Sequence, residues 1–321
     1  MLKNIFSLIL ILITLLSCQP QAQGLSDEIV ETEFSEVVTP PIVVDSVFQD
    51  SLQPKDLLPV RVEFENANSI KLVSWNIRHL GRSKSAEEIL AIAKILRNFD
   101  IVAIQEVVAK DPAGAQAVAK IADELNRMGS KWDYQISDPT KSPSSNISER
   151  YAFLWKTSKV SLQHRAYLDK ELEEICYREP FIAKFKTKKG SEDFYVINYH
   201  SRKYYDKPEE EIIHFIDYPK RLETENILIA GDFNLDENHA VWKPLYHKGF
   251  TNSLHQQPTT LKMKCKDGNY LNHAIDNIYF LPGIQRHNAE TIDFVQKCKY
   301  LELARGISDH LPIFIEFNLK N

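Results

Sequence analysis

Three consecutive segments decide the fold class: IKLVSWNI (Ile70–Ile77), SAEEILAIAKILRNF (Ser85–Phe99) and DIVAIQEV (Asp100–Val107). The first and the third are apolar runs with the length of a β-strand. The middle segment has Ser85 and Glu88 at the spacing of a helix capping box, followed by apolar residues at helical spacing. A strand, a helix and another strand in this order are typical of α/β proteins.

The alternation of strands and helices continues toward the C-terminus. Pro112 opens a predicted helix that runs to about Met128, and PEEEIIHFIDYPKRL (208–222) predicts another. Further strands are predicted at YAFLWK (151–156), PFIAKFKT (180–187), DFYVINYH (193–200), NILIAGDFN (226–234), HAIDNIYF (273–280) and HLPIFIEF (310–317). So many strands with few helices between them indicate two packed β-sheets flanked by helices.

The first residues predict export. Lys3 is followed by the apolar run 5–16, which is too short to span a bilayer and has the length of a signal-peptide core. The run ends in LLSC (15–18), which resembles the cleavage box of bacterial lipoproteins. We therefore expect residues 1–18 to be a signal peptide with this box, and Cys18 to carry a lipid anchor. The alternative is a plain signal peptide. The mature protein would be a bacterial membrane-anchored lipoprotein, periplasmic or on the cell surface.

Residues 19–66 are expected to form a linker. The stretch from Gly24 to Asn66 contains ten acidic residues, two basic residues and four prolines. This composition is typical of a stalk of low order. The net charge of the chain, −5, therefore comes from the linker, and residues 67–321 form a near-neutral domain. Such a charge neither requires nor excludes an anionic substrate.

Four cysteines are present, and lipidation of Cys18 would leave three. We expect a disulfide between Cys265 and Cys298. The sequence contains no CxxC pair, which argues against a zinc ribbon.

Polar residues recur where the predicted apolar strands begin or end. They are Asn76, Gln105, Glu106, His200, Asp232, Asn234 and His310, and Asp276 lies inside another apolar run. A single residue of this kind could be an ordinary loop end in solvent, or a buried acid whose hydrogen bonds are all made. A buried carboxylate, however, costs several kcal/mol unless it is paired or bound to a metal ion. Many of them at strand ends predict a functional site on a rigid scaffold.

The residue types in this set point to a reaction class. Two histidines flanked by acids can serve as general base and general acid near neutral pH. Carboxylate and amide oxygens suit a hard divalent cation, Mg²⁺ or Mn²⁺. The sequence has neither a Walker phosphate loop nor a Gly-x-Ser-x-Gly elbow. Metal-assisted hydrolysis at a phosphorus centre fits this set best.

The motifs resemble one family in both sequence and order. SWNIRHLG, DIVAIQEV, YHS, IAGDFN, AIDNIYF and SDHLPI resemble the endonuclease/exonuclease/phosphatase superfamily, and SERYAFLW and YREPFIAKF resemble its deoxyribonuclease I-like branch. The resemblance covers residues 69–319. It implies a four-layer α/β sandwich of two mixed β-sheets. We expect a monomer, although the sequence does not determine the oligomeric state. The resemblance further implies an endonuclease that cleaves DNA or RNA with Mg²⁺, or with Mn²⁺ or Ca²⁺. The alternative is a phosphatase or a sphingomyelinase-like phosphodiesterase acting on a small or lipid substrate.

The resemblance also implies roles for single residues. The two histidines would form the acid–base pair, with His310 as the base. Asp276 would hold the tautomer of His310, and Glu149 would orient His200. The implied catalytic residues are His200, His310, Asp276, Glu149, Asp232 and Asn234. The implied metal-site residues are Glu106, Asn76 and Asp309, and the implied phosphate contacts are Arg78 and Arg178.

The chain departs from deoxyribonuclease I at positions that concern the duplex. That enzyme reaches into the minor groove with an arginine and a tyrosine, where this chain has Val108 and Ile147. The cysteines of its small disulfide are replaced by Glu237 and His273. Catalysis is therefore better supported than duplex recognition. The loop SRKYYDKPEE (201–210) is basic and aromatic, so it is either a nucleic-acid contact or an ordinary solvated loop.

A third reading, from another class, is a surface binding module on an inactive scaffold. That reading predicts a missing catalytic residue, and every motif residue is present.

Overall fold

The computed structural model describes residues 52–57, 60–190 and 192–320. The predicted signal peptide, the Cys18 anchor and most of the predicted linker lie outside the described residues. In the described part of the chain, none of the helices has both the length and the apolar composition needed to cross a membrane.

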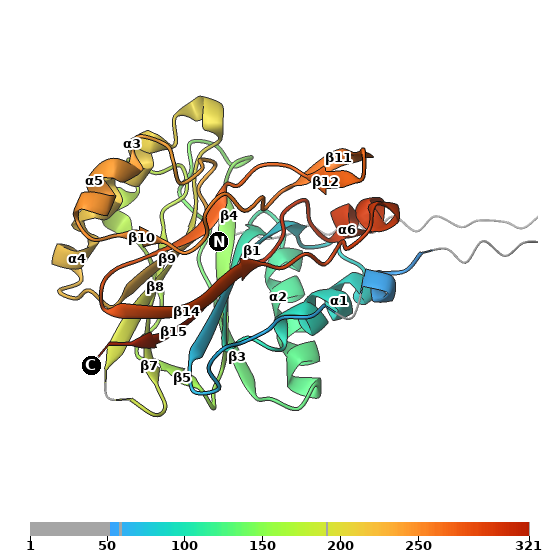
Figure 1. The fold of residues 1–321 in the computed structure, drawn as a ribbon, viewed down its shortest axis with the longest axis horizontal. Helices are drawn as coiled ribbons and strands as arrows, with labels where there is room; N and C mark the ends of the chain where they lie inside the picture. The colour runs from blue at the N-terminus through green and yellow to red at the C-terminus, as the bar shows by residue number, and fades with distance from the viewer. Residues whose placement is uncertain (1–51, 58–59, 191, 321) are drawn as a thin grey trace, which may run out of the picture. The chain divides into compact units, whose positions relative to one another are not determined.

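Two β-sheets form the centre of the folded unit (Figure 1). The first sheet has the order β14-β15-β1-β2-β4-β3, and the second has the order β10-β13-β9-β8-β7-β5, with β6 paired to β7. The strands of the first sheet are β1 Ile70–Leu80, β2 Ile101–Val108, β3 Trp132–Ile136, β4 Glu149–Lys156, β14 Ile284–Thr291 and β15 Ile313–Leu319. Those of the second are β5 Val160–Leu162, β6 Tyr167–Leu168, β7 Phe181–Thr187, β8 Asp193–His200, β9 Ile227–Asp232, β10 Thr251–Asn252 and β13 Asp276–Phe280. A separate hairpin joins β11 Leu261–Lys266 to β12 Asn269–Leu271.

Helices cover the outer faces of both sheets (Figure 1). Those beside the first sheet are α1 Ala86–Leu96, α2 Ala113–Arg127 and α6 Leu301–Ile307. Those beside the second are α3 Glu209–Ile212, α4 Tyr218–Arg221 and α5 Trp242–His247. Short 3-10 turns are η1 Pro54–Leu57, η2 Lys170–Leu172, η3 Tyr204–Asp206, η4 Ile213–Asp217 and η5 Cys298–Tyr300. Each sheet is mixed, because β1–β2 and β8–β9 are parallel and their other pairings are antiparallel. The predicted four-layer α/β sandwich is confirmed.

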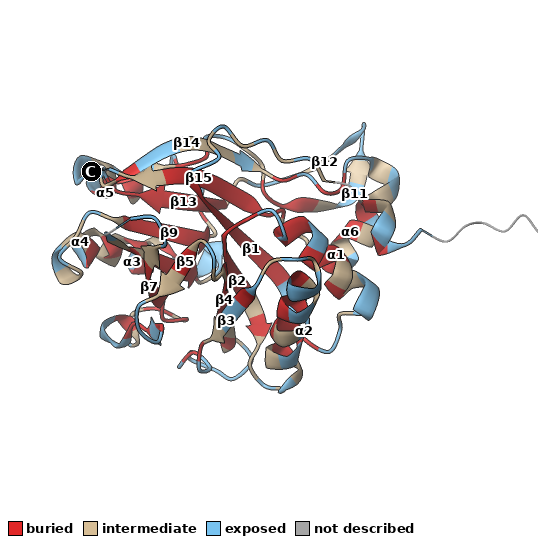
Figure 2. Cartoon of the chain, turned by 90° about the horizontal axis from the view of Figure 1, so that it is seen from below, coloured by how far each residue is buried: buried red, intermediate tan, exposed pale blue. Residues whose placement is uncertain are grey.

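Strand side chains alternate between two apolar layers. On β1, Leu72 belongs to the core between the sheets, whereas Val73 and Trp75 belong to the core under α1 and α2. On β9, Leu228 faces the first sheet and Ile229 faces the helices of the second. Because both faces of these strands are buried (Figure 2), their sequences are nearly continuous apolar runs.

The structure corrects two expectations. The helix expected over 208–222 is divided into α3, η4 and α4, with Pro219 near the start of α4. The folded unit begins before residue 67, because Leu57 is fully buried and Val62 and Phe64 pack on the core under α1. Apolar residues alternate at 60, 62 and 64 in the predicted linker, and this pattern could have indicated that the segment packs on the core.

Two local expectations are confirmed. The Ser85 hydroxyl accepts from the Glu88 backbone N–H, and the Glu88 carboxylate accepts from the Ser85 N–H, so α1 starts with a complete capping box. Cys265 and Cys298 form a disulfide between β11 and η5. The strand β14 was missed because its sequence, IQRHNAET, is polar and half exposed, as an edge strand can be.

A buried carboxylate ties the segment before β1 to the last strand. Glu316 of β15 is fully buried and accepts hydrogen bonds from the backbone N–H groups of Glu65 (2.7 Å) and Asn66 (2.8 Å), and from the Ser69 hydroxyl. Burial opposes ionisation of Glu316, but these three donors outweigh it and lower its pKa. The charged carboxylate therefore stabilises the fold.

We expect Glu316→Gln to lower the free energy of unfolding by about 2 kcal/mol at neutral pH, because the amide group loses charge-assisted bonds. A lowered pKa in the folded state gives stability that is complete above the unfolded pKa of about 4.3 and is lost as the pH falls through the folded value. Urea unfolding from about pH 7 to pH 3 should show the difference between the two proteins shrinking in acid. The exposed Glu290→Gln on β14 is the matched control and should change stability by under about 0.5 kcal/mol. A difference between Glu316→Gln and the unsubstituted protein that stays constant over this pH range would contradict the argument.

Candidate active site

The ends of two pairs of parallel strands, one pair in each sheet, bring predicted residues together. In the first sheet Asn76 on β1 is in register with Gln105 on β2, one residue before Glu106. In the second sheet His200 on β8 is in register with Asp232 on β9. The register of β8 and β9 depends on Gly231, since a Cβ atom there would lie 1.8 Å from the carbonyl oxygen of Tyr199. The glycine of GDFN therefore permits the approach that aligns His200 with Asp232.

Hydrogen bonds to the ring and to the backbone of His310 hold this residue in place. Its Nδ1 lies 2.9 Å and 3.1 Å from the two carboxylate oxygens of Asp276, at the start of β13. The Thr259 hydroxyl donates to Asp276 at 2.6 Å, and the Trp75 indole N–H donates to the carbonyl oxygen of His310 at 2.8 Å. Burial lowers the pKa of His310, but Asp276 and Asp232 outweigh it and raise the pKa to about 10. The imidazolium is thus the stabilised form, and Nε2 is left for chemistry.

His200 has a different set of neighbours. Its Nδ1 lies 2.8 Å from Oε1 of Glu149, the first residue of β4. The buried guanidinium of Arg178 lies 3.1 Å from the same oxygen and 3.5 Å from Nε2 of His200. Burial and Arg178 lower the pKa of His200, whereas Glu149 and Asp232 raise it, with a net upward shift. Arg178 therefore holds Glu149 and faces the imidazole, which is more than the phosphate contact expected from the sequence.

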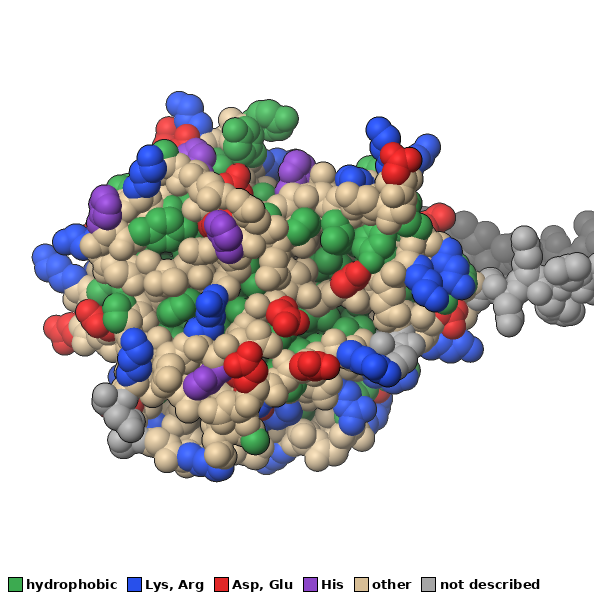
Figure 3. Space-filling view, in the orientation of Figure 1, with side chains coloured by type: hydrophobic (Ala, Val, Ile, Leu, Met, Phe, Trp, Pro, Cys, Tyr) green, Lys and Arg blue, Asp and Glu red, His purple; other side chains and the backbone are tan. Residues whose placement is uncertain are grey.

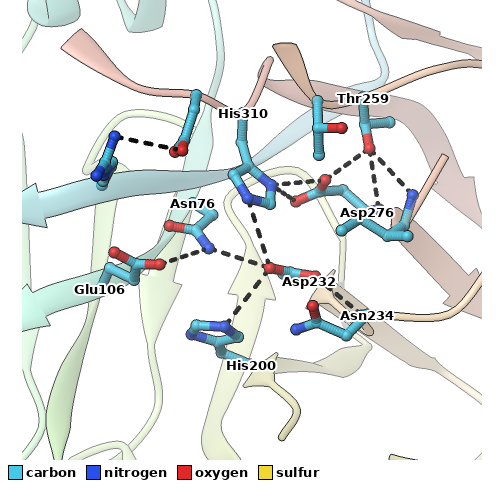
Figure 4. Close-up of polar contacts among 12 residues, drawn as sticks. Asn76, Glu106, His200, Asp232, Asn234, Thr259, Asp276 and His310 are labelled. Carbon is cyan, nitrogen blue, oxygen red and sulfur yellow. Dashed lines mark hydrogen bonds and ion pairs between the residues drawn. The ribbon is translucent and has the colours of Figure 1, made fainter. Parts of the chain in front are cut away.

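Both imidazoles converge on one carboxylate (Figure 4). Oδ2 of Asp232 lies 3.5 Å from Nε2 of His200 and 3.8 Å from Nε2 of His310. The same oxygen accepts from the amide of Asn76 at 3.1 Å, and Oδ1 accepts from the backbone N–H of Asn234 at 2.9 Å. The predicted acid–base pair thus lies around a single point between the two sheets.

Glu106 and Asn76 form the part of the site that fits a cation. The Asn76 amide donates to Oε1 of Glu106 at 3.2 Å, and the backbone N–H of His79 donates to Oε2 at 3.1 Å. Burial raises the pKa of Glu106, but His200, the His79 N–H and further donors lower it to about 2. Oδ1 of Asn76 is buried and has no hydrogen-bond partner among the described residues. An ionised carboxylate beside an unpartnered amide oxygen is a donor set for a hard divalent cation.

A second group could also hold a metal ion by distance alone. Ligand atoms of Asp232, Asp276 and His310 lie within 4.8 Å of one another. However, Nδ1 of His310 and the carboxylate of Asp276 already satisfy each other, and Thr259 occupies the same carboxylate. The unpartnered oxygen of Asn76 makes Glu106 and Asn76 the better cation site.

Backbone strain accompanies the site. Glu106 (φ 60°), His79 (φ 50°) and Asn234 (φ 51°) adopt the left-handed conformation although none of them is glycine. Each such residue costs roughly 1–3 kcal/mol. These residues lie on β1, on β2 and shortly after β9, close to the ends that form the site.

The remaining predicted residues lie in the same cavity, of about 670 Å³, which His200, His310, Glu106 and Asp232 also line. Arg78 is half exposed and lies 3.5 Å from the carboxylate of Asp309. Asp309 also lies 3.6 Å from Arg305, so the structure pairs it with arginines, not with Glu106 or Asn76.

Three supporting residues were missed by the sequence reasoning. Thr259 bonds Asp276, and Ser308 donates to the carbonyl oxygen of Asn76 at 2.6 Å. The Tyr151 hydroxyl accepts from the backbone N–H of His200 at 3.1 Å. Ser308 belongs to the motif SDH and Tyr151 to the motif ERY, so the motifs could have indicated both residues. Thr259 lies in a loop without a motif.

Comparisons of the sequence with known proteins find a family and several relatives. The model of the Endonuclease/Exonuclease/phosphatase family matches residues 73–261. Deoxyribonuclease-1 of Oryctolagus cuniculus is 28% identical over 198 residues, covering 57% of this chain and 67% of the relative, so the chain spans about two thirds of that enzyme. Deoxyribonuclease gamma of Homo sapiens is 24% identical over 281 residues, covering 83% of this chain and 90% of the relative.

A solved structure shares the fold. The mannosyl-6-phosphatase of Bacteroides thetaiotaomicron VPI-5482 superposes with a TM-score of 0.56 at 17% identity, covering 78% of this chain and 100% of that one.

If Glu106 and Asn76 hold a divalent cation, Mg²⁺ or Mn²⁺ should raise the melting temperature. The expected rise is about 5 °C at a cation concentration about 100 times the Kd. Glu106→Gln should abolish the rise, because the cation loses its charged ligand. The exposed Glu87→Gln on α1 removes the same charge elsewhere and should keep the full shift. Differential scanning calorimetry measures this, and an equal shift in the Glu106→Gln protein would place the cation elsewhere.

Proposed function

Since the chain belongs to the endonuclease/exonuclease/phosphatase family, in its deoxyribonuclease I-like branch, we propose that it is a metal-dependent endonuclease hydrolysing phosphodiester bonds of DNA or RNA. One observation carries the proposal: Nε2 of His200 and Nε2 of His310 both lie within 4.0 Å of the same oxygen of Asp232. Two imidazoles so placed, each with a carboxylate on its Nδ1, can act as acid and base on one scissile bond.

In the proposed reaction, Nε2 of His200 takes a proton from a water molecule, and the water oxygen attacks phosphorus. The bond from phosphorus to the leaving ester oxygen breaks, and Nε2 of His310 gives that oxygen its proton. One product ends in a phosphate monoester and the other in a hydroxyl group. Water supplies the hydroxyl on phosphorus, and one proton enters the histidine pair as another leaves it.

The surroundings of the two histidines support this division of roles. Against the effect of burial, Asp276 and Asp232 raise the pKa of His310 to about 10 and so hold it as the imidazolium at neutral pH, which suits the proton donor. We therefore assign the acid to His310, in place of the base role expected from the resemblance. Burial and Arg178, which lies 3.5 Å from Nε2 of His200, lower the pKa of that imidazole and so favour the neutral form that accepts a proton. Asn234 lies next to Asp232 at the end of β9, where its side-chain amide would hold a phosphate oxygen.

Glu106 and Asn76 would hold the cation, with Mg²⁺ or Mn²⁺ as the proposed ion, and a bound cation supplies charge neutralisation at the phosphate oxygens. Arg78, which lines the cavity, would contact a neighbouring phosphate of the strand.

The second candidate is a phosphatase or a sphingomyelinase-like hydrolase. Val108 and Ile147 line the cavity in place of groove-reaching side chains, and these two apolar residues favour a small or lipid phosphoester. A panel of plasmid DNA, RNA, a phosphomonoester and sphingomyelin, each with Mg²⁺ and Mn²⁺, separates the two. Cleavage of the phosphomonoester or the lipid without cleavage of nucleic acid would select this candidate.

Export with a lipid anchor on Cys18 is part of the proposal, and its support is the apolar run 5–16 followed by LLSC. An extracellular or periplasmic enzyme of this kind would meet nucleic acid released from other cells.

His310→Ala and His200→Ala should each lower kcat for plasmid cleavage by about 10²- to 10⁴-fold, because each removes one proton-transfer group. Nicking of supercoiled plasmid on agarose gels, with circular dichroism to verify folding, measures the loss. The exposed His164→Ala lies outside the cavity and should retain full activity. Full activity of a folded His310→Ala protein would refute the acid–base assignment.

A further inference from the structure

Two adjacent tyrosines project from the wall of the active-site cavity. Tyr204 is 62% exposed and Tyr205 is 92% exposed, and they are the most exposed aromatic side chains in the part of the chain that the structure describes. Both line the cavity that holds His200 and His310. Because water disfavours exposed aromatic surface, such rings beside a site indicate a contact surface.

The loop that carries the tyrosines is firmly anchored. Nε of Arg202 lies 2.8 Å from a carboxylate oxygen of the fully buried Glu211, whose other oxygen accepts from the Arg202 backbone N–H at 3.0 Å. The Arg202 guanidinium also donates to the carbonyl oxygen of Asp206 at 3.3 Å, which closes the loop around η3. The backbone that carries the rings is thus held in place, which lowers the entropy cost of binding.

The rings are arranged so that an aromatic face remains open. Their centroids are 5.7 Å apart and their planes are at 85°, an edge-to-face contact. Tyr204 therefore supports Tyr205 from one side, and at 92% exposure Tyr205 keeps most of its ring in solvent.

The charges around the rings suit a nucleic-acid backbone at close range. Lys203 and Lys110 line the same cavity as the two tyrosines. On the part of the surface formed by the described residues in Figure 3, basic and acidic side chains are interspersed without a broad basic area. Lys203 and Lys110 would hold a strand at the cavity through local contacts.

We propose that Tyr204 and Tyr205 form a stacking platform for unpaired nucleobases, so that single-stranded nucleic acid is the preferred substrate class. This inference rests on the proposed function. In a duplex the faces of the bases are covered by their neighbours, so only a single-stranded or splayed base can stack on a protein ring. Val108 and Ile147, at the places where groove insertion is expected, are consistent with a site that does not grip duplex DNA.

The test compares strands with and without bases. A short single-stranded oligonucleotide is prepared in two forms, one with normal nucleotides and one with abasic spacers flanking the cleaved phosphate. Tyr205→Ala should lower kcat/KM about ten-fold on the normal strand, mainly through a higher KM, and clearly less on the abasic strand. Tyr205→Trp should retain the preference for bases. Tyr167→Ala, a half-exposed tyrosine outside the cavity, is the control and should behave as the unsubstituted protein.

A binding measurement separates this inference from the proposed function. In the His310→Ala background, fluorescence anisotropy should show the Tyr205→Ala change weakening single-stranded DNA or RNA about ten-fold and duplex DNA much less. Cleavage that is indifferent to Tyr205, or equal losses with and without bases, would overturn the platform and leave the nuclease standing. If binding depends on Tyr205 but the unsubstituted protein cleaves no nucleic acid, the platform would be supported and the nuclease rejected. No binding of nucleic acid by the unsubstituted chain would overturn both.

Discussion

The carboxylate of Asp232 is the contact on which the rest of the site depends, because the two sheets meet at it. Asn76 reaches it from the first sheet at 3.1 Å, and the imidazoles of His200 and His310 approach it from either side (Figure 4). A buried carboxylate costs several kcal/mol unless nitrogen donors surround it. The edges of both sheets must therefore stay in place for Asp232 to be stable, and the same constraint fixes the distance between the proposed acid and base.

The core of the sandwich holds this edge in place. Below the site, the amide of Gln105 on β2 donates to Asn198 on β8 at 2.6 Å, and Asn198 donates in turn to the carbonyl oxygens of Ile104 and Ala152 at 3.1 Å. This buried polar bridge joins the sheets in the middle of an otherwise apolar layer. Buried polar contacts specify one relative placement more strictly than apolar packing does. The strained backbone at Glu106 and Asn234 is sustained by that rigid frame.

Much of the fold and of the site could be predicted from sequence, for identifiable reasons. Strands such as β1 and β9 are buried on both faces, so they appear as apolar runs, and their polar ends mark the site. The edge strand β14 is polar and gives no such signal. The ion pairs of Asp309 and the double contact of Arg178 depend on distances between segments that are remote in sequence, so residue type alone could not predict these contacts. Thr259 was not predicted because nothing in its own neighbourhood distinguishes it from an ordinary loop threonine.

The central claim is that one scissile phosphate sits between His200 and His310, beside a cation on Glu106. Anomalous diffraction from crystals grown with Mn²⁺ and a phosphorothioate oligonucleotide tests it most directly. The account predicts a manganese peak about 2 Å from a Glu106 oxygen and from Oδ1 of Asn76, with the phosphorus within hydrogen-bond reach of both imidazoles through its oxygens. A peak among Asp232, Asp276 and His310 alone, or a phosphate bound away from either histidine, would contradict it.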